Sequence, residues 1–403
     1  MLLRVLIFLA IALLLFLPFN WITVRQLTRI HPRRKRWIVA TAVAGNLMWP
    51  FFPLLRSFTD FSRLARAVLG PLWFGWTCFA ILYAVFIFLL LLAWIPFGVL
   101  GGRRLAGRTA AASAAPAGGR WYGRRGGGPP SFAQFARWPS RVFLFIVAIG
   151  CVIGYEQALV PLRIERVTMR VPNLAQPVRL VLMGDLHVGL FSRPSRLEQI
   201  FATASSLRPD AVLIAGDMID DDPHFVPKLL AGTRALSASI PLYAVLGNHE
   251  MYGNPFTTLD RMRGSRIRLL VNEGVSVRDL WIAGVSDPDA KRLPDAKQLV
   301  PDLGKALAAK PSASVPIVLA HQSRILAEAR KRGIPVVLCG HTHGGQLGIR
   351  PWGLSLAGVF DPYDMGYYDV PPTQLYVNTG TGYWLFPFRL GMTPEITVVE
   401  LRR

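Results

Sequence analysis

Polar residues of the types that bind divalent metal ions follow five short apolar segments in the second half of the chain. The segments are 179–183, 211–215, 242–246, 316–320 and 335–339. The residues that follow them are Asp185 and His187, Asp217, Asn248, His321, and finally His341 and His343. Hard and borderline divalent ions accept carboxylate, amide-carbonyl and imidazole ligands. Seven candidates are too many for one tetrahedral ion and match two ions that share a bridging carboxylate.

The apolar segments have the length and composition of buried strands. Segments with helical spacing lie between some of them, at 195–207, 223–237 and 323–332. The pattern therefore predicts an α/β domain with a largely parallel sheet, and in such folds ligands collect beyond the carboxyl ends of the strands. A single Asp-x-His or Gly-Asp pair is ordinary turn chemistry. Motifs of this kind after all five segments are better explained by a metal site.

The motifs resemble those of the calcineurin-like metallophosphoesterase superfamily. The matching stretches are Asp185-x-His187, Gly216-Asp217, Gly247-Asn248-His249-Glu250, His321 and Gly340-His341-Thr342-His343. The Gly-His-Thr-His-Gly-Gly-Gln form at 340–346 and the tail that begins at 375 resemble the YkuE- or YaeI-like branch of bacterial phosphodiesterases. The resemblance covers nearly all of 175–402 and implies a four-layer αββα sandwich. One departure is visible, because His-Gln-Ser stands at 321–323 where relatives usually carry His-Asn-Pro.

The resemblance also implies a role for each motif residue. The first ion would take Asp185, His187, Asp217 and His343, and the second would take Asp217, Asn248, His321 and His341. Asp217 would bridge the two ions together with a hydroxide that attacks the phosphoester, and His249 would protonate the leaving oxygen or stabilise its charge. We expect two divalent metal ions, with Mn²⁺ favoured and Fe or Zn as alternatives. Such a pair acidifies a water and neutralises the phosphoryl oxygens.

Residues outside these motifs carry weaker signals. Arg389 could pair with a substrate phosphate or lie on the surface. Asp220 could orient a ligand or cap the following helix. Glu250 is typical of a turn or of a residue that supports the ligands, and Asp287 could lie near the cleft, although an ordinary turn is favoured. The segment 352–384 is rich in Trp, Tyr, Phe and Gly. It could belong to the core or form an amphipathic rim for a lipid- or sugar-bearing substrate.

The first 160 residues have a different composition. They hold 18 Lys and Arg but only two acids, for a net charge of +16, and the remainder holds 27 and 22 for a net charge of +5; together these give the total of +21. Apolar runs at about 3–20, 37–55, 72–100 and 142–160 are long enough to consider as membrane helices. We therefore predict an all-α transmembrane domain over 1–160 and a metallophosphoesterase domain over 161–403. The Gly/Ala/Pro-rich stretch 109–130 is typical of a flexible linker.

The basic loops predict an orientation. Lys and Arg gather at 25–36 and 103–141, and short basic loops stay on the cytoplasmic side. With four spans, the N-terminus and the C-terminal domain fall on the opposite side. We expect a multi-pass protein of the inner (cytoplasmic) membrane with an extracytoplasmic catalytic domain. If 37–55 does not fully span, this parity argument fails.

Three functions fit these features. The first is a membrane-anchored phosphodiesterase acting on a phosphoester substrate that is lipid- or cell-wall-linked. The second is a UDP-2,3-diacylglucosamine-type pyrophosphatase of lipid A synthesis, whose cytoplasmic substrate conflicts with the expected orientation. The third is a catalytically silent membrane sensor, which the complete ligand set disfavours. The partner we expect besides the substrate is the lipid bilayer. Nucleic acid is disfavoured because most of the charge lies in loops between spans.

Overall fold

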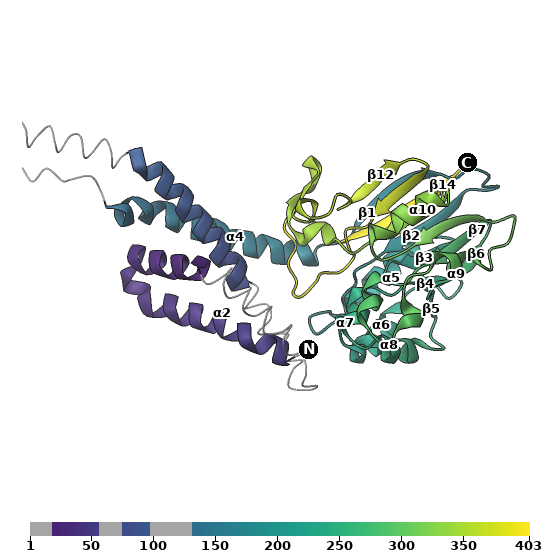
Figure 1. The fold of residues 1–403 in the computed structure, drawn as a ribbon, viewed down its shortest axis with the longest axis horizontal. Helices are drawn as coiled ribbons and strands as arrows, with labels where there is room; N and C mark the ends of the chain where they lie inside the picture. The colour runs from purple at the N-terminus through teal and green to yellow at the C-terminus, as the bar shows by residue number, and fades with distance from the viewer. Residues whose placement is uncertain (1–17, 56–74, 97–130) are drawn as a thin grey trace, which may run out of the picture. The chain divides into compact units, whose positions relative to one another are not determined.

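The computed structural model describes residues 18–55, 75–96 and 131–403, with side chains from 47 to 55 excluded (Figure 1). The chain divides into two compact units, Met1–Ile149 and Gly150–Arg403, called here the N-terminal and C-terminal units. We predicted the domain boundary after residue 160. Most of the predicted helix 3–20 and the predicted linker 109–130 lie outside the described residues.

The described part of the N-terminal unit is helical. Its elements are a helix over 18–30, η1 (Pro32–Arg34), α2 (Lys35–Leu55), a helix over Gly75–Pro96 and the first part of α4 (Phe132–Leu159). The helices pack around the buried side chains of Tyr83 and Ile87. The Tyr83 hydroxyl and the Ser140 hydroxyl share a 2.7 Å hydrogen bond, which satisfies both polar groups inside this apolar core.

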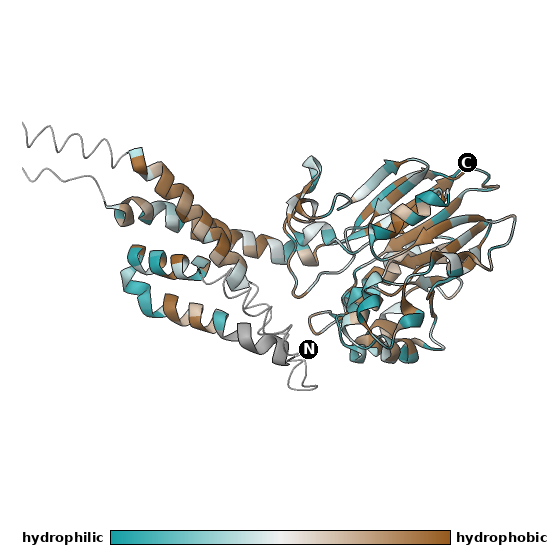
Figure 2. Cartoon of the chain, viewed as in Figure 1, coloured by the Kyte–Doolittle hydropathy of each residue, from teal (hydrophilic) through white to brown (hydrophobic). Residues whose placement is uncertain are grey.

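Two of the described helices, Gly75–Pro96 and Phe132–Leu159, are long and apolar enough to cross a membrane. Only 22% and 11% of their apolar stretches are buried, whereas a core helix of a soluble protein would be mostly buried. Figure 2 shows that hydrophobic residues, coloured brown, predominate along much of both helices. The predicted helix at 37–55 forms as α2 but is not one of these two, so the described residues do not confirm a four-helix membrane domain.

Helix α4 starts ten residues before the predicted position at 142. The start is fixed by Ser131, whose backbone N–H donates to Gln134 Oε1 at 2.8 Å while Gln134 N–H donates to Ser131 Oγ at 3.4 Å. This reciprocal pair is a capping box, and its Ser-x-x-Gln pattern was visible in the sequence. The helix continues through Pro139.

The C-terminal unit contains two six-stranded sheets. The first has the order β1 (Arg163–Arg170), β14 (Glu395–Arg402), β2 (Val178–Met183), β3 (Ala211–Ile214), β4 (Leu242–Ala244), β5 (Ile267–Leu269). The second has the order β12 (Gly366–Val370), β13 (Thr373–Val377), β9 (Val336–Cys339), β8 (Val315–Leu319), β7 (Leu280–Gly284), β6 (Glu273–Val277). Strands β2 to β5 are mutually parallel, and so are β13, β9, β8 and β7.

The two sheets pack face to face, with helices on their outer faces. Leu180 and Leu182 of β2 point inward to meet Ile317 and Leu338 of the second sheet. The alternate residues point outward to α5 (Pro194–Ser206), α6 (Val226–Thr233) and α8 (Pro255–Met262). Helices α9 (Leu303–Leu307) and α10 (Leu326–Lys331) cover the second sheet. Because both faces of each central strand are buried, these strands read as continuous apolar runs, and the α/β prediction is confirmed.

Short elements complete the unit. They are α7 (Asn248–Tyr252), η2 (Pro223–Phe225), η3 (Pro288–Arg292), η4 (Lys297–Leu299), η5 (Ser323–Ile325), η6 (His343–Gln346), η7 (Arg350–Trp352), η8 (Ala357–Val359), and the antiparallel pair β10 (Gly348–Ile349) and β11 (Leu354–Ser355).

Candidate metal centre

All seven predicted ligands lie just past the carboxyl ends of central strands, where the edges of the two sheets meet. Asp185, His187, Asp217 and Asn248 follow β2, β3 and β4 of the first sheet, and His321, His341 and His343 follow β8 and β9 of the second. Five of them have a positive φ: Asp185, His187, Asp217, His341 and His343. Positive φ is uncommon outside glycine, and such conformations persist where the surrounding structure imposes them, often at functional sites.

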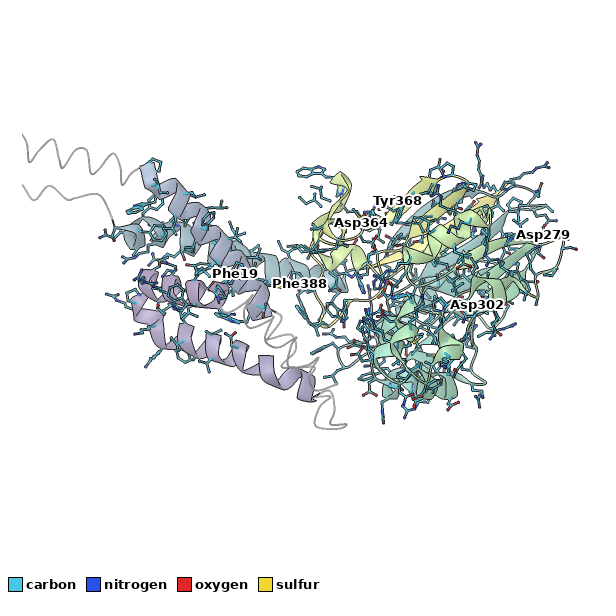
Figure 3. All side chains as sticks on the ribbon, viewed as in Figure 1. Phe19, Asp279, Asp302, Asp364, Tyr368 and Phe388 are labelled. Atoms are coloured by element: carbon cyan, nitrogen blue, oxygen red, sulfur yellow. The ribbon has the colours of Figure 1, made fainter. Side chains whose placement is uncertain are left out.

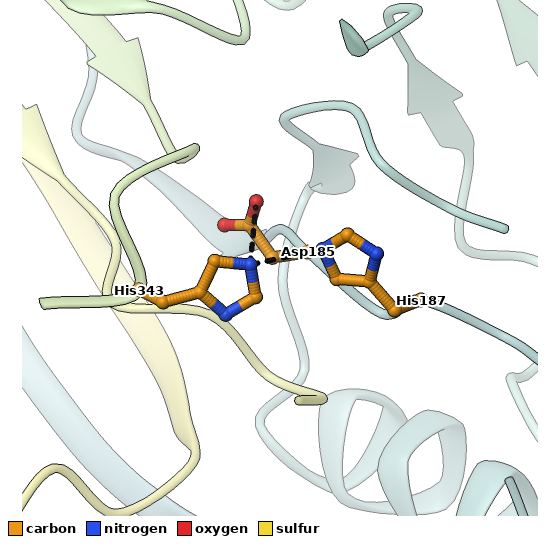
Figure 4. Close-up of side chains that lie close together, drawn as sticks. All are labelled: Asp185, His187 and His343. Atoms are coloured by element: carbon orange, nitrogen blue, oxygen red, sulfur yellow. Dashed lines mark hydrogen bonds and ion pairs between the residues drawn. The ribbon is translucent and has the colours of Figure 1, made fainter. Parts of the chain in front are cut away.

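Asp185, His187 and His343 form one group of facing ligand atoms (Figure 4). The Nε2 atoms of the two histidines are 2.9 Å apart, and His343 Nε2 is 3.5 Å from Asp185 Oδ1. The Asp185 carboxylate is oriented by the backbone N–H of His341, which donates to both oxygens at 3.0 and 3.1 Å. The three side chains are buried.

Asp217, His321 and His341 form a second group. His321 Nε2 lies 3.1 Å from His341 Nδ1 and 2.8 Å from Asn248 Oδ1. The other ring nitrogen, His321 Nδ1, donates to the carbonyl oxygen of Ala215 at 2.7 Å, so the tautomer with Nε2 free to bind a metal is favoured.

The Asp217 carboxylate lies between the two groups. Its Oδ2 is 3.2 Å from His321 Nε2 and 3.6 Å from His187 Nε2. Its Oδ1 accepts the backbone N–H of His249 at 2.9 Å. Imidazole nitrogens and carboxylate oxygens that converge in this way are a donor set that fits Mn²⁺, Fe or Zn²⁺. The residues present therefore fit a divalent metal centre.

The electrostatics of the cluster favour neutral imidazoles at two positions. Burial, reinforced by His321, lowers the pKa of His341 to about 3, and burial together with His187 lowers the pKa of His343 well below its ordinary value. The neutral ring is the form that binds a metal. Burial alone would raise the pKa of Asp217, but the imidazoles of His321 and His249 hold it well below the ordinary value, so this carboxylate is ionised.

The predicted catalytic residue, His249, lies in α7, and a ring nitrogen of it is within 4.8 Å of ligand atoms of His187 and Asp217. Its Nδ1 is 2.7 Å from Asp221 Oδ1 and 3.5 Å from Asp220 Oδ1, although the closer pair is not aligned as a hydrogen bond. Burial alone would lower the pKa of His249, but Asp217, Asp220 and Asp221 hold it well above the ordinary value. His249 is therefore protonated and can donate.

Glu250 has a larger structural role than its sequence predicted. Its buried carboxylate accepts four backbone N–H groups, those of Gly247 at 2.7 Å, Met218 at 2.8 Å, and Asp217 and Ile219 at 3.1 Å. It thereby ties the loop after β3 to the start of α7. The spacing of Glu250 three residues after Gly247, as in a capping box, was the available signal.

Gln322, which stands where relatives usually carry Asn, has a hydrogen-bond partner close by. Gln322, next to His321, donates its side-chain N–H groups to both carboxylate oxygens of Asp287 at 2.9 and 3.2 Å. Asp287 also accepts the backbone N–H of Asp289 at 2.8 Å, which makes it the N-cap of η3. The turn expected at Asp287 is present, but it is buried against the metal-site loop.

The predicted contact between Arg389 and substrate is not supported. Arg389 is fully buried, and its guanidinium donates to the carbonyl oxygens of Gly382, Thr379 and Met392 at 2.7, 2.8 and 3.2 Å. Its Nη2 lies 3.2 Å from His343 Nδ1. Arg389 is thus held by carbonyl oxygens around its own loop and contacts the ring of the candidate ligand His343 instead of facing a substrate.

The fold and the donor set define a metallophosphoesterase, and comparison with known proteins agrees. The family model for calcineurin-like phosphoesterases matches residues 178–345. An uncharacterized metallophosphoesterase of Aquifex aeolicus is 31% identical over 245 residues, which are 60% of this chain and 92% of the relative. The chain therefore belongs to the calcineurin-like metallophosphoesterase family, whose members are metal-dependent phosphoric ester hydrolases.

Other relatives are longer than the matched region. An uncharacterized metallophosphoesterase of Helicobacter pylori is 30% identical over 250 residues, and the match spans 62% of this chain but 66% of the relative. A protein of Danio rerio named "Transmembrane protein with metallophosphoesterase domain" is 32% identical over 278 residues, 64% of this chain and 62% of that one. The YkuE protein of Bacillus subtilis is 24% identical over 280 residues, which supports the narrower YkuE-like resemblance only weakly.

Proposed function

We propose that this protein is a membrane-associated, dinuclear metal-dependent phosphodiesterase of the YkuE-like branch that hydrolyses a phosphoester of an envelope component. The observation that carries the proposal is the position of Asp217. One oxygen of its carboxylate faces an imidazole of each ligand group, at 3.2 and 3.6 Å. A carboxylate shared in this way is the arrangement that two neighbouring ions require.

Asp185, His187 and His343 would hold one ion, and Asn248, His321 and His341 would hold the other, with Asp217 shared. When bound, a pair of divalent ions, which we propose to be Mn²⁺, supplies positive charge that acidifies water and neutralises the phosphoryl oxygens. The chain's own residues fix the ligands. Glu250 holds the Asp217 loop through backbone N–H groups, and Arg389 holds the loop beside His343.

His249 would act on the leaving group. Water attacks phosphorus and releases a proton to solvent, the bond from phosphorus to the leaving oxygen breaks, and that oxygen takes a proton from the His249 imidazolium. The products are a phosphomonoester and an alcohol, and His249 regains its proton from solvent. The carboxylates of Asp220 and Asp221 stabilise the protonated ring. A histidine whose pKa is held above its ordinary value stays protonated and can supply the proton for this step.

The membrane assignment rests on two exposed apolar helices and on relatives named as transmembrane proteins. The Arg residues at 103–125 lie between these two helices in the sequence, and a basic connection favours the cytoplasmic side, which would leave the C-terminal unit extracytoplasmic. A reporter fused after Arg403 tests this orientation. Periplasmic activity of the reporter is expected. Cytoplasmic activity would favour a nucleotide-linked lipid precursor as substrate instead.

Hydrolysis of bis-p-nitrophenyl phosphate with Mn²⁺ tests the activity. His249→Gln should lower kcat by about 10²- to 10⁴-fold with both ions retained, whereas Asp217→Asn should also lower the metal content of the purified protein. Asp260→Asn and His224→Gln, matched changes at exposed positions, should leave both unchanged. Unchanged hydrolysis in His249→Gln and Asp217→Asn would overturn the proposal, and wild-type protein without bound metal would favour a silent sensor.

A further inference from the structure

An exposed apolar surface begins four residues after the candidate ligand His343. The segment 347–360, called here the apolar excursion, contains β10, η7, β11 and η8. Seven large apolar side chains on it are exposed: Leu347, Ile349, Trp352, Leu354, Leu356, Val359 and Phe360. Trp352 and Phe360 are the most exposed, at 73% and 84%. Clusters of this kind mark interaction surfaces, because scattered single residues would need no explanation.

The polar groups of the excursion are used to hold it in place. Arg350, its only charged residue, donates to Thr379 Oγ1 and Glu165 Oε1 at 3.0 Å and pairs with the buried Glu395. Ser355 Oγ accepts the Gly358 backbone N–H and donates to Asp364, which is labelled in Figure 3. The segment is therefore anchored on its inner side and presents an uncharged apolar surface outward.

The excursion is hydrogen-bonded to the loop that contacts the end of α4. Gly348 N–H donates to Leu390 O at 2.9 Å, and Leu390 N–H donates to Gln346 O at 2.8 Å. The adjacent residues of that loop bind α4, since Arg389 N–H donates to Gly154 O at 2.8 Å and Gly391 N–H to Gln157 Oε1 at 2.6 Å. All these residues belong to the C-terminal unit.

The end of α4 is itself part of an apolar helix long enough to cross a membrane. Within the C-terminal unit its Val152, Ile153 and Tyr155 are exposed, and Phe388 of the loop, labelled in Figure 3, packs close to Gly154. The excursion thus lies one loop away from a helix with exposed apolar side chains. A bilayer that surrounds the helix would end near this loop.

We propose that the apolar excursion inserts into the interfacial layer of the same bilayer and brings the metal centre to phosphoesters carried by lipids. Apolar surfaces of this type enter the boundary between headgroups and acyl chains, and tryptophan is favoured at that depth. The proposal deepens the proposed function and rests on it for the substrate. The occupant is the bilayer, and the absence of acidic residues from 347–360 fits an anionic lipid surface.

The depth of the apolar excursion in the bilayer can be measured on the full chain without a hydrolysis assay. Phe360→Cys is spin-labelled in a Cys151→Ser background, which removes the exposed native cysteine, and the protein is reconstituted into nanodiscs of phosphatidylethanolamine and phosphatidylglycerol. The label should collide with lipid-soluble oxygen in preference to an aqueous nickel chelate. A label at Arg263→Cys, an exposed charged position immediately after α8, should show the opposite preference. Equal accessibility at both positions would overturn the proposal.

Two further arms separate the alternatives. The measurement is repeated with one chain per nanodisc. If the label at position 360 is protected from the nickel chelate only when several chains share a nanodisc, a second copy covers the surface, and this result would also overturn the proposal. Trp352→Ser with Phe360→Ser should lower hydrolysis of a bilayer-embedded phosphodiester about tenfold or more and leave hydrolysis of bis-p-nitrophenyl phosphate unchanged. Phe256→Ser, at another exposed apolar position, should change neither. If the wild-type protein did not hydrolyse bis-p-nitrophenyl phosphate at all, that result would instead contradict the proposed function.

Discussion

Replacing Gly247 by alanine should disable the metal centre without removing a ligand. A Cβ on Gly247 would lie 2.5 Å from the Asp217 backbone nitrogen and 2.8 Å from its carboxyl carbon, and closer still to Oδ1. The backbone at Gly247, with φ −105° and ψ −175°, is available to alanine, so the cost comes from the clash alone. The methyl group would displace the carboxylate that faces both ligand groups.

The size of the effect follows from two contributions. Forcing a methyl group into a packed site costs about 1–3 kcal/mol, and losing the bond from His249 N–H to the Asp217 carboxylate costs about 1.5–3 kcal/mol. A destabilisation of about 3 kcal/mol or more corresponds to a fall in Tm on the order of 10 °C for a unit of this size. Moving the carboxylate by about 1 Å should lower hydrolysis about 100-fold.

The matched control is Gly184→Ala, immediately before the candidate ligand Asp185. A Cβ there would meet only Ala215 Cβ at 3.5 Å and two atoms at 3.8 Å, which are ordinary contacts. Thermal unfolding, metal content and phosphodiester hydrolysis are measured for both variants. Gly247→Ala should show a lower Tm, less bound metal and slower hydrolysis, whereas Gly184→Ala should match the wild-type protein in all three. The reverse result, or equal effects, would refute this reasoning.

Three other outcomes are expected. Removing divalent ions with a chelator should abolish hydrolysis and lower Tm, and Mn²⁺ should restore both; activity that survives chelation would contradict a metal centre. Glu250→Gln should destabilise the protein by about 2–4 kcal/mol, because an amide cannot accept all four backbone N–H groups. An unchanged denaturation midpoint would contradict this expectation. Burial, partly offset by His321, raises the pKa of Asp287 to about 6, above the unfolded value of about 3.9. The stability that Asp287 contributes is therefore complete below about pH 4 and is lost as pH rises through 6. In metal-free protein, Asp287→Asn should flatten this part of the pH profile of Tm.

The positions of the ligand candidates could be predicted because two simple rules act together. Apolar runs ending in Asp, Asn or His identify the strands, and the carboxyl ends of parallel strands share an edge. The structure brings all seven side chains together at that edge. The side chains that support them could not be predicted in the same way. Arg389 carries a charge, so the sequence favoured a surface or a substrate, but backbone carbonyls of its own loop surround it.

Long-range pairing was the other limit. Strand β1 pairs with β14, so residues near 165 lie beside residues near 397. A local sequence pattern does not predict which distant strand will be the partner. The carboxylates behind His249 were also partly misjudged. Of the two roles expected for Asp220, the cap of η2 belongs to Asp222 instead, whereas Asp220 lies 3.8 Å from Nδ1 of the candidate ligand His187. Asp221 lies closest to His249, because a turn with positive φ at Asp221 directs adjacent side chains differently from a helix.

The division of α4 between the two compact units affects how a soluble catalytic fragment can be made. A fragment beginning at residue 161 would lack Gln157 and Gly154, the partners of Gly391 and Arg389. The loop that carries Arg389 would lose these two hydrogen bonds, which would weaken its support of His343, and the fragment could fold yet bind metal poorly. A fragment beginning at Gly150 keeps these partners but also keeps the exposed Val152 and Ile153. Solubility and an intact metal centre therefore make opposite demands on the same ten residues, 150–159.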